Sequence, residues 1–515
     1  MNKTQQFIIY ILSVAFFVAS CSSRSSGKDV NEVDPPATNI ILLMGDDHGW
    51  EETGYNGHPY IQTPVLDEMA KKGLVFDRFY SAHPTCSPTR GSIITGRHPN
   101  RYGAYTPGWS VRPEEISIAR MLKDAGYATS HVGKWHLGPV KAGSPTNPGA
   151  MGFDHWVSHD NFFEMDPVLS RNGAPPKQIT GEGSEVIIDE AIAFIENART
   201  KGKPFFSVVW FGSPHEPYQA LPEDLARYED LPDSLNKEYV RLTSLKTGES
   251  TLRPLDSVLR ERYAEITAMD RAIGKLRDYL TTEGIKENTL IWYCGDNGIP
   301  PSGLYHSSLR GLKGTVFEGG TKVPGIIEWP QEIAEPTVSE VNAVTTDIFL
   351  TLADIASVAL PQRPLDGVSL VPVIHGRAIE RAQPIPFWNF DTQHLSDSMP
   401  YIDPELQQGT TPLAKIMDGK FTRNFKNYHH RAIKEEDYKG DRAILDNRYK
   451  LVIDDRSGTA VKELFDIRED PGETLNRIND FPEIADELEM QLKEWQRSVL
   501  ESLTGSDYQQ MSDDP

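Results

Sequence analysis

Cysteine is almost missing from this chain. Only Cys21, Cys86 and Cys294 occur among 515 residues. Three thiols cannot form the dense disulfide framework of small secreted domains, so a chain of this length must bury a large apolar core. A Cys86–Cys294 disulfide stays open from the sequence. Cys294, however, ends the strand-like run Thr289–Cys294 and is expected to act as a small buried hydrophobe, which leaves Cys86 to be explained.

Positive charge is also scarce. The chain has 52 lysines and arginines against 74 aspartates and glutamates, a formal net charge of −22. This balance argues against nucleic acid as a partner and against general steering of polyanions toward the protein. An anionic substrate must therefore be held by a local basic pocket.

Long apolar runs are limited to the beginning of the chain. Phe7–Ala19 follows Lys3 and is short for a membrane span, as in a secretion signal. The residues leading to Cys21 resemble the lipobox of bacterial lipoproteins, which implies a signal peptide over 1–20, lipidation (palmitate) of Cys21 and a tether over 21–37. We therefore expect export and lipid anchoring to a membrane, in the periplasm or at the surface of the outer membrane. An ordinary signal peptide and an uncleaved anchor are the alternatives.

Strand-like and helix-like segments alternate over residues 38–375. Asn39–Met44 is a continuous apolar run, typical of a buried strand. Further strands are expected at Leu74–Phe79, Tyr127–Val132, Phe205–Phe211 and Thr289–Cys294, and helices after Pro64, after Cys86, and at Ile116–Asp124, Glu185–Asn197 and Leu255–Leu280. This alternation predicts an α/β domain with a large, wound, mostly parallel sheet flanked by helices.

The pattern changes over residues 376–515. Short strands are expected at Pro384–Phe390, Ala443–Leu445, Tyr449–Ile453 and Glu463–Ile467, before an amphipathic helix at Pro482–Leu503. Turn residues separate these runs, so we predict a smaller α+β domain with an antiparallel sheet. Residues 391–440 are polar and irregular, and are expected to be an insertion.

Polar residues follow four of the expected strands. They are Asp46 and Asp47, Lys134 and His136, His215, and Asp296 and Asn297. Any one group has an ordinary explanation, as a helix cap, a tight turn or a surface histidine. Ligands of open α/β sheets bind beyond the carboxyl ends of the strands, so we expect all four groups to form one site.

The residue types indicate the chemistry of this site. Asp46, Asp47, Asp296 and Asn297 offer only oxygen ligands, which suit Ca²⁺ or Mg²⁺ and not zinc. Positive charge would come from Arg90, Lys134 and Lys313, and proton transfer from His136 and His215. The set predicts cleavage of an ester of a small, multiply oxygenated anion.

Cys86 opens the segment Cys86-Ser87-Pro88-Thr89-Arg90, at the start of a short helix whose N-terminus favours anions. With Thr95-Gly96-Arg97 this segment resembles the signature of type I sulfatases, which belong to the alkaline-phosphatase-like superfamily. The motifs around Lys134, His215, Asp296 and Lys313 follow in that family's order, and the similarity runs from about residue 38 to about residue 475. The family usually has Ser or Ala where this chain has Thr89.

The resemblance implies a reaction and a role for each residue. Cys86 would be oxidised to formylglycine by a formylglycine-generating or anaerobic sulfatase-maturating enzyme, and an oxygen of the hydrated aldehyde would attack the ester sulfur. The metal, calcium more than magnesium, would be bound by Asp46, Asp47, Asp296, Asn297 and the modified residue 86. Arg90 would hold the aldehyde side chain, Lys134 and Lys313 the sulfate. His215 would protonate the leaving sugar, and His136 would help to expel sulfate.

The expected substrate is a sulfated polysaccharide or its oligosaccharides. Candidate sugar-binding residues are His155, with His159, Asp160 and Asn161 shortly after it, and, farther along the chain, His306 and Arg310. Two alternatives stay open: a formylglycine-dependent phosphodiesterase or phosphonate hydrolase, and an inactive glycan-binding lipoprotein.

Overall fold

The computed structural model describes residues 37–509, except residue 164 and the segments 233–237, 244–249, 304–306, 396–398, 413–421 and 456–458. The expectations for the signal peptide, for Cys21 with most of the tether, and for His306 lie outside the described residues. Among the helices that are described, none has the length and apolar character needed to cross a membrane.

A ten-stranded mixed sheet forms the centre of the molecule. Its middle strands run parallel in the order β11 (Thr289–Gly295), β1 (Asn39–Gly45), β8 (Phe205–Trp210), β4 (Ala128–Lys134) and β5 (His155–His159). Beyond β11 lie β13 (Gly325–Glu328), β2 (Leu74–Phe76) and β14 (Thr337–Ser339), and beyond β5 lie β6 (Val168–Arg171) and β7 (Lys177–Gln178). The expected wound, mostly parallel sheet is confirmed.

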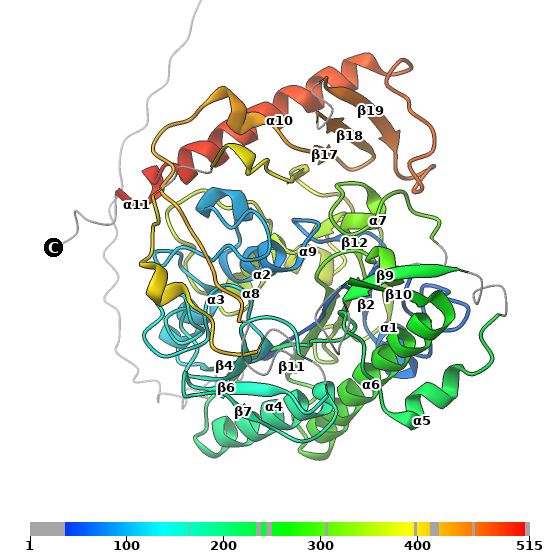
Figure 1. Ribbon diagram of the computed structural model, residues 1–515, viewed down its shortest axis with the longest axis vertical. Coiled ribbons are helices and arrows are strands. Elements are labelled where there is room, and N and C mark those ends of the chain that lie inside the picture. The colour runs from blue at the N-terminus through cyan, green and yellow to red at the C-terminus, as the bar shows by residue number, and fades with distance from the viewer. Residues whose placement is uncertain are drawn as a thin grey trace, which may run out of the picture. The chain divides into compact units, whose positions relative to one another are not determined.

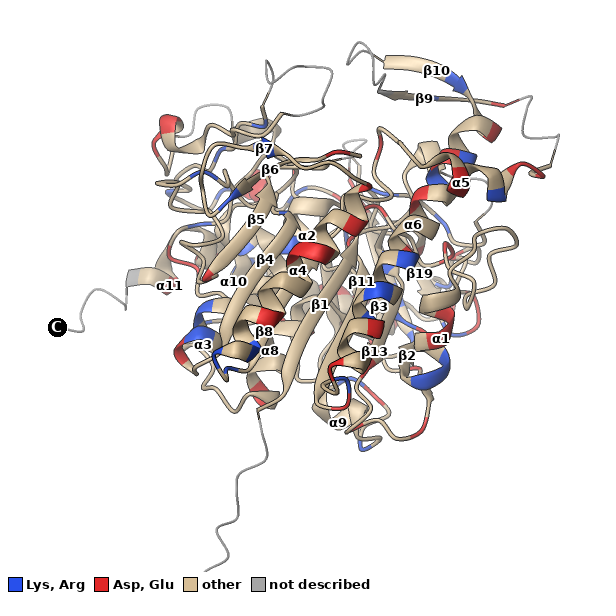
Figure 2. Cartoon of the chain, turned by 90° about the horizontal axis from the view of Figure 1, so that it is seen from below, with Lys and Arg blue, Asp and Glu red and all other residues tan. Residues whose placement is uncertain are grey.

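Helices cover both faces of this sheet, as the alternation along β1 requires. Ile41 and Leu43 belong to a buried cluster with α1 (Pro64–Lys72), α4 (Gly183–Thr200) and α6 (Leu255–Thr282). Figure 2 shows α4 and α6 lying in front of the strands. Ile40 and Leu42 point to the other face, in a cluster with α2 (Cys86–Thr95), α3 (Ile118–Asp124) and α8 (Thr346–Ile355). Each fully buried aliphatic side chain contributes about 1.5–3 kcal/mol, so the two cores hold the strand ends in fixed positions.

Shorter elements complete the structure. One small sheet consists of β12 (Lys322–Val323), β3 (Phe79–Tyr80) and β15 (Ala343–Val344), and another of β9 (Tyr239–Thr243) and β10 (Ser250–Pro254). The short helices are α5 (Pro222–Leu225), α7 (Glu318–Thr321), α9 (Val371–Ile374) and α11 (Ser506–Gln509). The single strand expected at Leu74–Phe79 is wrong in one respect, since β2 and β3 belong to different sheets. The chain turns between them at Arg78, whose guanidinium donates to Asn342.

The second sheet is antiparallel and has four strands. It contains β16 (Ile385–Trp388), β17 (Arg442–Leu445), β18 (Tyr449–Asp454) and β19 (Val461–Asp466), paired in chain order. Its outer face packs through Leu451 and Leu464 against Leu488 and Leu492 of α10 (Pro482–Leu503), which lies beside β17–β19 in Figure 1. The expected small antiparallel sheet and final helix are confirmed.

The polar segment 391–440 joins β16 to β17 and is called the insertion below. Its described parts contain only single 3₁₀ turns, at Gln393–Leu395, Pro404–Gln407 and Glu435–Tyr438. Isolated bridges connect Pro400 to Tyr428, Pro412 to Thr422, and Lys426 to Trp109. The last bridge attaches the insertion to the part of the chain that carries the large sheet.

Candidate active site

Four strands of the large sheet deliver polar residues to one edge. β1 pairs in parallel with β11 so that Gly45 lies opposite Gly295, and with β8 so that Met44 lies opposite Trp210. Trp210 is in turn opposite Gly133 of β4. The residues that follow these positions therefore lie at the same edge of the sheet, and the expectation that the four groups come together there is confirmed.

An acidic cluster lies where β1 and β11 end. The backbone N–H of Asp47 donates to Asp296 Oδ1 at 2.8 Å, and the side-chain amide of Asn297 donates to Asp47 Oδ1 at 2.9 Å. Asp47 has φ +63°, a left-handed conformation that is uncommon for a residue other than glycine. Such strain collects at functional sites, where the surroundings must hold it in place.

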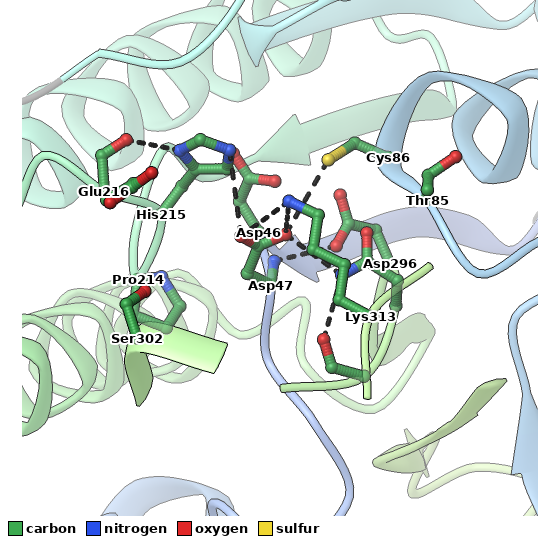
Figure 3. Close-up of polar contacts among 12 residues, drawn as sticks. Asp46, Asp47, Thr85, Cys86, Pro214, His215, Glu216, Asp296, Ser302 and Lys313 are labelled. Carbon is green, nitrogen blue, oxygen red and sulfur yellow. Dashed lines mark hydrogen bonds and ion pairs between the residues drawn. The ribbon is translucent and has the colours of Figure 1, made fainter. Parts of the chain in front are cut away.

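Each carboxylate of the cluster has a basic partner. Lys134 Nζ lies 2.6 Å from Asp46 Oδ2, and Lys313 Nζ lies 2.6 Å from Asp47 Oδ1. Arg90 Nη2 lies 2.7 Å from Asp296 Oδ2 and 3.3 Å from Asp46 Oδ1. Figure 3 shows Lys313 reaching over Asp47, with Asp46 and Asp296 beside it. The charges of three cations and three carboxylates thus balance in a largely buried space. An incoming anion can bind there only if the cations exchange their carboxylate partners for the anion.

The surroundings shift the pKa values of Asp47 and Asp296 in opposite directions. Burial by itself raises the pKa of Asp47, but the charges of Lys313, His215 and Lys134 outweigh it and hold that pKa well below its usual range. Burial, together with the negative charge of Asp46, raises the pKa of Asp296 to about 6. Asp47 is therefore firmly ionised, whereas Asp296 is ionised at neutral pH but takes up a proton when the pH falls below about 6.

Cys86 is the first residue of α2 and is only 1% exposed. Its Sγ lies 3.7 Å from Asp47 Oδ1, and burial raises the pKa of the thiol to about 12. Cys86 and Cys294 are both free, so the alternative of a disulfide between them is wrong. Cys294 is buried in β11, as expected. Thr89, which stands where the type I sulfatase signature usually has Ser or Ala, fits this helix because its hydroxyl donates to the carbonyl oxygens of His83 and Thr85.

The two candidate histidines lie on this edge as well. His215 Nε2 is 3.7 Å from Asp47 Oδ2, and its Nδ1 donates to the carbonyl oxygen of Glu216 at 2.5 Å. Burial lowers the pKa of His215 to about 3, although Asp47 opposes the change. His136 is buried, and no described residue forms a hydrogen bond with either of its ring nitrogens. Burial, with the charge of Lys134, lowers its pKa well below the usual range. Both rings are neutral at neutral pH in this state.

The cluster also fits a divalent cation. Asp46 Oδ1 and Asn297 Oδ1 are buried and accept no hydrogen bond from the described part of the chain, which is uncommon for buried polar atoms without a ligand to bind. Ligand atoms of Asp46, Asp47, Cys86 and His215 lie within 4.8 Å of one another. The aspartate and asparagine oxygens suit a hard ion such as Ca²⁺.

Two candidate sugar-binding residues, His155 and Arg310, are placed differently from the residues of the acidic cluster. The expectation for His155 is wrong: β5 runs parallel to β4 with His159 opposite Lys134, so His155 lies four residues back, toward the far edge of the sheet. Arg310 lies 3.0 Å from Glu463 and stacks on Phe317, which ties its loop to β19.

Asp160 lies beside the site but its carboxylate is already engaged. It accepts backbone N–H groups from Val140, Thr410 and Thr411, and so fixes the insertion to the end of β5. His159 Nδ1 accepts from the N–H of Asn161, within the same turn. Asp160 and His159 therefore fix the backbone conformation at the end of β5.

Sequence reasoning missed two arginines near the site. Arg262 of α6 donates to the carbonyl oxygens of Asp47 and Pro214, at 2.6 and 2.5 Å, and pairs with Glu52. Arg423 of the insertion lies close enough to His136 for its charge to help lower the pKa of that ring. Neither belongs to a local motif. The one signal in the sequence is the apolar spacing along α6, which places Arg262 one turn from Leu259 and Ile266 and so on the buried face of the helix.

Comparisons with known proteins agree on one family. The sequence model described as Sulfatase matches residues 38–358. N-acetylgalactosamine-6-sulfatase of Rattus norvegicus is 30% identical over 424 residues, covering 74% of this chain and 71% of the relative. Arylsulfatase A of Homo sapiens is 31% identical over 374 residues, covering 69% and 70%.

Solved structures share the fold at lower identity. Ps i-CgsB in complex with k-i-k-neocarrahexaose has a TM-score of 0.70 and 22% identity, and the match covers 93% of this chain and 98% of that one. The phosphonate monoester hydrolase of Agrobacterium radiobacter has a TM-score of 0.62 and 18% identity, covering 90% and 97%. These likenesses concern the fold alone.

Proposed function

Because the chain belongs to the sulfatase family, and is therefore a sulfuric ester hydrolase, we propose that it removes sulfate from a sulfated polysaccharide or its oligosaccharides. The observation that carries this proposal is the balanced set of three cations and three carboxylates around Cys86. The relatives named for a sulfatase of N-acetylgalactosamine, and the k-i-k-neocarrahexaose bound in a solved neighbour, support the substrate class.

We further propose that Cys86 is matured to formylglycine and that Asp46, Asp47, Asp296 and Asn297 hold Ca²⁺, with Mg²⁺ as the less favoured ion. When present, the hydrated aldehyde supplies the nucleophilic oxygen and the ion neutralises charge on the sulfate. Arg90, which is buried and pairs with Asp46 and Asp296, would hold residue 86. A maturating enzyme is the partner that this proposal requires.

The two lysines bind the sulfate group. In this structure Lys134 and Lys313 neutralise Asp46 and Asp47, and a bound cation would take over that task. The ammonium groups are then free to donate to sulfate oxygens, where positive charge also stabilises the transition state. Asp47 holds the pKa of Lys313 above its usual value, so this lysine is charged before substrate arrives.

The two histidines move protons. Because His215 donates through Nδ1 to the Glu216 carbonyl, its Nε2 is the nitrogen that faces the acidic cluster. A sulfate bound next to this ring raises its pKa, which lets Nε2 carry a proton to the leaving sugar oxygen. His136 is neutral, and neither of its nitrogens is hydrogen-bonded to a residue that the structure describes, so one of them can accept a proton when sulfate is expelled.

The two alternatives make different predictions. A phosphodiesterase or phosphonate hydrolase is compatible with the fold, but the Lys134 and His136 pair favours sulfate. An inactive glycan-binding protein is disfavoured because no ligand or catalytic position identified here is missing.

The test is a screen for sulfate release. The chain, co-expressed with a formylglycine-generating enzyme, is incubated with defined sulfated oligosaccharides, an aryl sulfate and a phosphate diester, with Cys86→Ala as the control. We expect release from at least one oligosaccharide by the wild type alone, and a peptide containing residue 86 whose mass is that of the aldehyde. Faster cleavage of the diester would support the first alternative, and an unmodified thiol with no release the second.

We also propose that the chain is exported and anchored by a lipid on Cys21. The apolar run Phe7–Ala19 and the lipobox-like residues before Cys21 support this proposal. The wild type should sediment with membranes and incorporate labelled palmitate, whereas Cys21→Ala should do neither. Equal sedimentation of both forms would contradict the proposal.

A further inference from the structure

Arg423 is the one cation identified at the site that has no acidic partner among the described residues. Arg90, Lys134 and Lys313 each pair with a carboxylate. No ion pair joins the Arg423 guanidinium to a carboxylate of the described chain, and its Nε is buried without a hydrogen bond. In a protein with a net charge of −22, a half-buried arginine without a carboxylate partner is an unusual arrangement.

The backbone around Arg423 is held on both sides. Lys426 donates its N–H to the carbonyl of Gly108 at 3.0 Å and accepts from Ser110 at 2.9 Å, while Phe425 donates to Gln407 at 2.8 Å. The side-chain amide of Asn427 donates to the carbonyls of Tyr102 and Ser110. Arg423 Nη1 lies 3.6 Å from the point that a Cβ on Gly108 would occupy. The arginine is therefore placed by the fold.

Its neighbours put it beside the reacting groups. The ring of Phe425, two residues on, packs edge-on to the ring of His136 with centroids 6.3 Å apart. Val111, which follows the Gly108 loop, donates its N–H to the carbonyl of Leu137, next to His136. The charge of Arg423 helps to lower the pKa of His136, and a thiolate at Cys86 would raise the pKa of Arg423.

We propose that Arg423 is a specificity-determining residue that binds a second anionic group of the substrate, close to the sulfate that is removed. This inference rests on the proposed function and deepens it, since it restricts the substrate to glycans that carry a uronate carboxylate or another sulfate near the scissile one. The guanidinium is suited to this because it presents paired N–H donors to planar or tetrahedral oxyanions. The scissile sulfate already has Lys134 and Lys313, and Arg90 holds residue 86.

The experiment compares three oligosaccharides that share the scissile sulfate found in the screen. The neighbouring group is a neutral hydroxyl in the first, a uronate carboxylate in the second and a further sulfate in the third. We measure kcat/KM for wild type, Arg423→Ala and Arg423→Lys, with Arg431→Ala as a matched control, because Arg431 is an exposed arginine of the same insertion. Thermal unfolding of each variant reports on folding.

We expect wild type to prefer one of the charged substrates, and Arg423→Ala to lower that preference by about 10- to 100-fold, the range for a lost hydrogen bond to a charged group. Arg423→Lys should restore part of the preference, and Arg431→Ala should match wild type. The preferred substrate identifies the carboxylate or the second sulfate as the ligand.

Three outcomes would overturn the inference. They are an unchanged preference in Arg423→Ala, an equal loss on all three substrates, which would place Arg423 on the scissile sulfate, and a wild type that favours the neutral substrate. A wild type that releases no sulfate from any of them would instead contradict the proposed function, so the two failures are distinguishable.

Discussion

Asn297 donates its side-chain N–H to Asp47 Oδ1 at 2.9 Å, while its own amide oxygen is buried without a hydrogen bond to any described residue. Asp46 Oδ1 likewise accepts no hydrogen bond, although Arg90 lies 3.3 Å away. An unsatisfied buried acceptor costs about 1–3 kcal/mol of stability. The two oxygens lie in the same cluster, so a cation that binds both would recover that free energy.

We therefore predict that Ca²⁺ stabilises the folded chain. A ligand at about 100 times its Kd adds about 2.7 kcal/mol to the free energy of unfolding, which raises Tm by several degrees. Asn297→Ala should abolish most of this shift, and Asn197→Ala, at an exposed position on α4, should retain it. Thermal scans with Ca²⁺ and with a chelator measure the effect, and an equal shift in the two variants would contradict the metal assignment.

These acceptors show which parts of the site a sequence can reveal. The proposed metal ligands follow buried apolar runs, namely Asp46, Asp47, Asp296 and Asn297. Parallel strands bring such positions together irrespective of the conformation of the connecting loops. The residues were therefore predictable, but their hydrogen bonds were not.

His215 should matter most when the leaving group is basic. A sugar alkoxide needs a proton as the S–O bond breaks, whereas 4-nitrophenolate leaves without one, and general acid catalysis contributes about 10²- to 10⁴-fold. His215→Ala should therefore lose that factor in kcat on a sugar sulfate and far less on 4-nitrophenyl sulfate. His375→Ala, at the end of α9, is the matched control. Equal losses on both substrates would show that His215 is not the acid.

Arg262 should act as a positioning residue. Its guanidinium joins the carbonyls of Asp47 and Pro214, and so fixes the acidic cluster relative to the turn that carries His215. Arg262→Lys cannot make these two bonds and the pair to Glu52 together, because an ammonium lacks the planar fork.

We expect Arg262→Lys to lower kcat at least tenfold with a smaller change in KM, and to weaken the Ca²⁺-induced rise in Tm. Arg260→Lys, on the same helix, is the control. Combining Arg262→Lys with Glu52→Gln should add little further loss, because the two residues act as one unit. A loss in KM alone would argue for direct substrate contact.

The positions that sequence reasoning misjudged depend on register and on long-range folding. His155 directly follows the Gly152-Phe153-Asp154 turn, and only the parallel pairing of β4 with β5 shows that it starts its strand on the far side of the sheet. Arg423 lies more than 300 residues after Cys86, in a segment without periodicity. Its position depends on backbone hydrogen bonds to the Gly108 loop, and no motif encodes them.

Buried histidines make stability depend on pH, and His98 offers a clean test. Its ring is 1% exposed and packs edge-on against Trp495, and burial lowers its pKa to about 3. The unfolded chain takes up a proton at about pH 6.5, whereas the folded chain does not. Stability is therefore fully present above pH 6.5 and is lost as the pH falls from there toward 3.

At pH 5 the solution is about 1.5 units below the unfolded pKa, so His98 alone costs about 2 kcal/mol relative to pH 7. His98→Asn removes this titration but keeps an acceptor for the N–H of Asn100, which His98 Nδ1 now caps at 3.3 Å. The variant should be less stable than wild type at pH 7, because it loses the contact with Trp495, yet the gap should narrow by about 2 kcal/mol at pH 5. Urea unfolding at the two pH values measures this difference, with exposed His429→Asn as the control. A constant gap between His98→Asn and wild type would mean that His98 is protonated in the folded chain as readily as in the unfolded one.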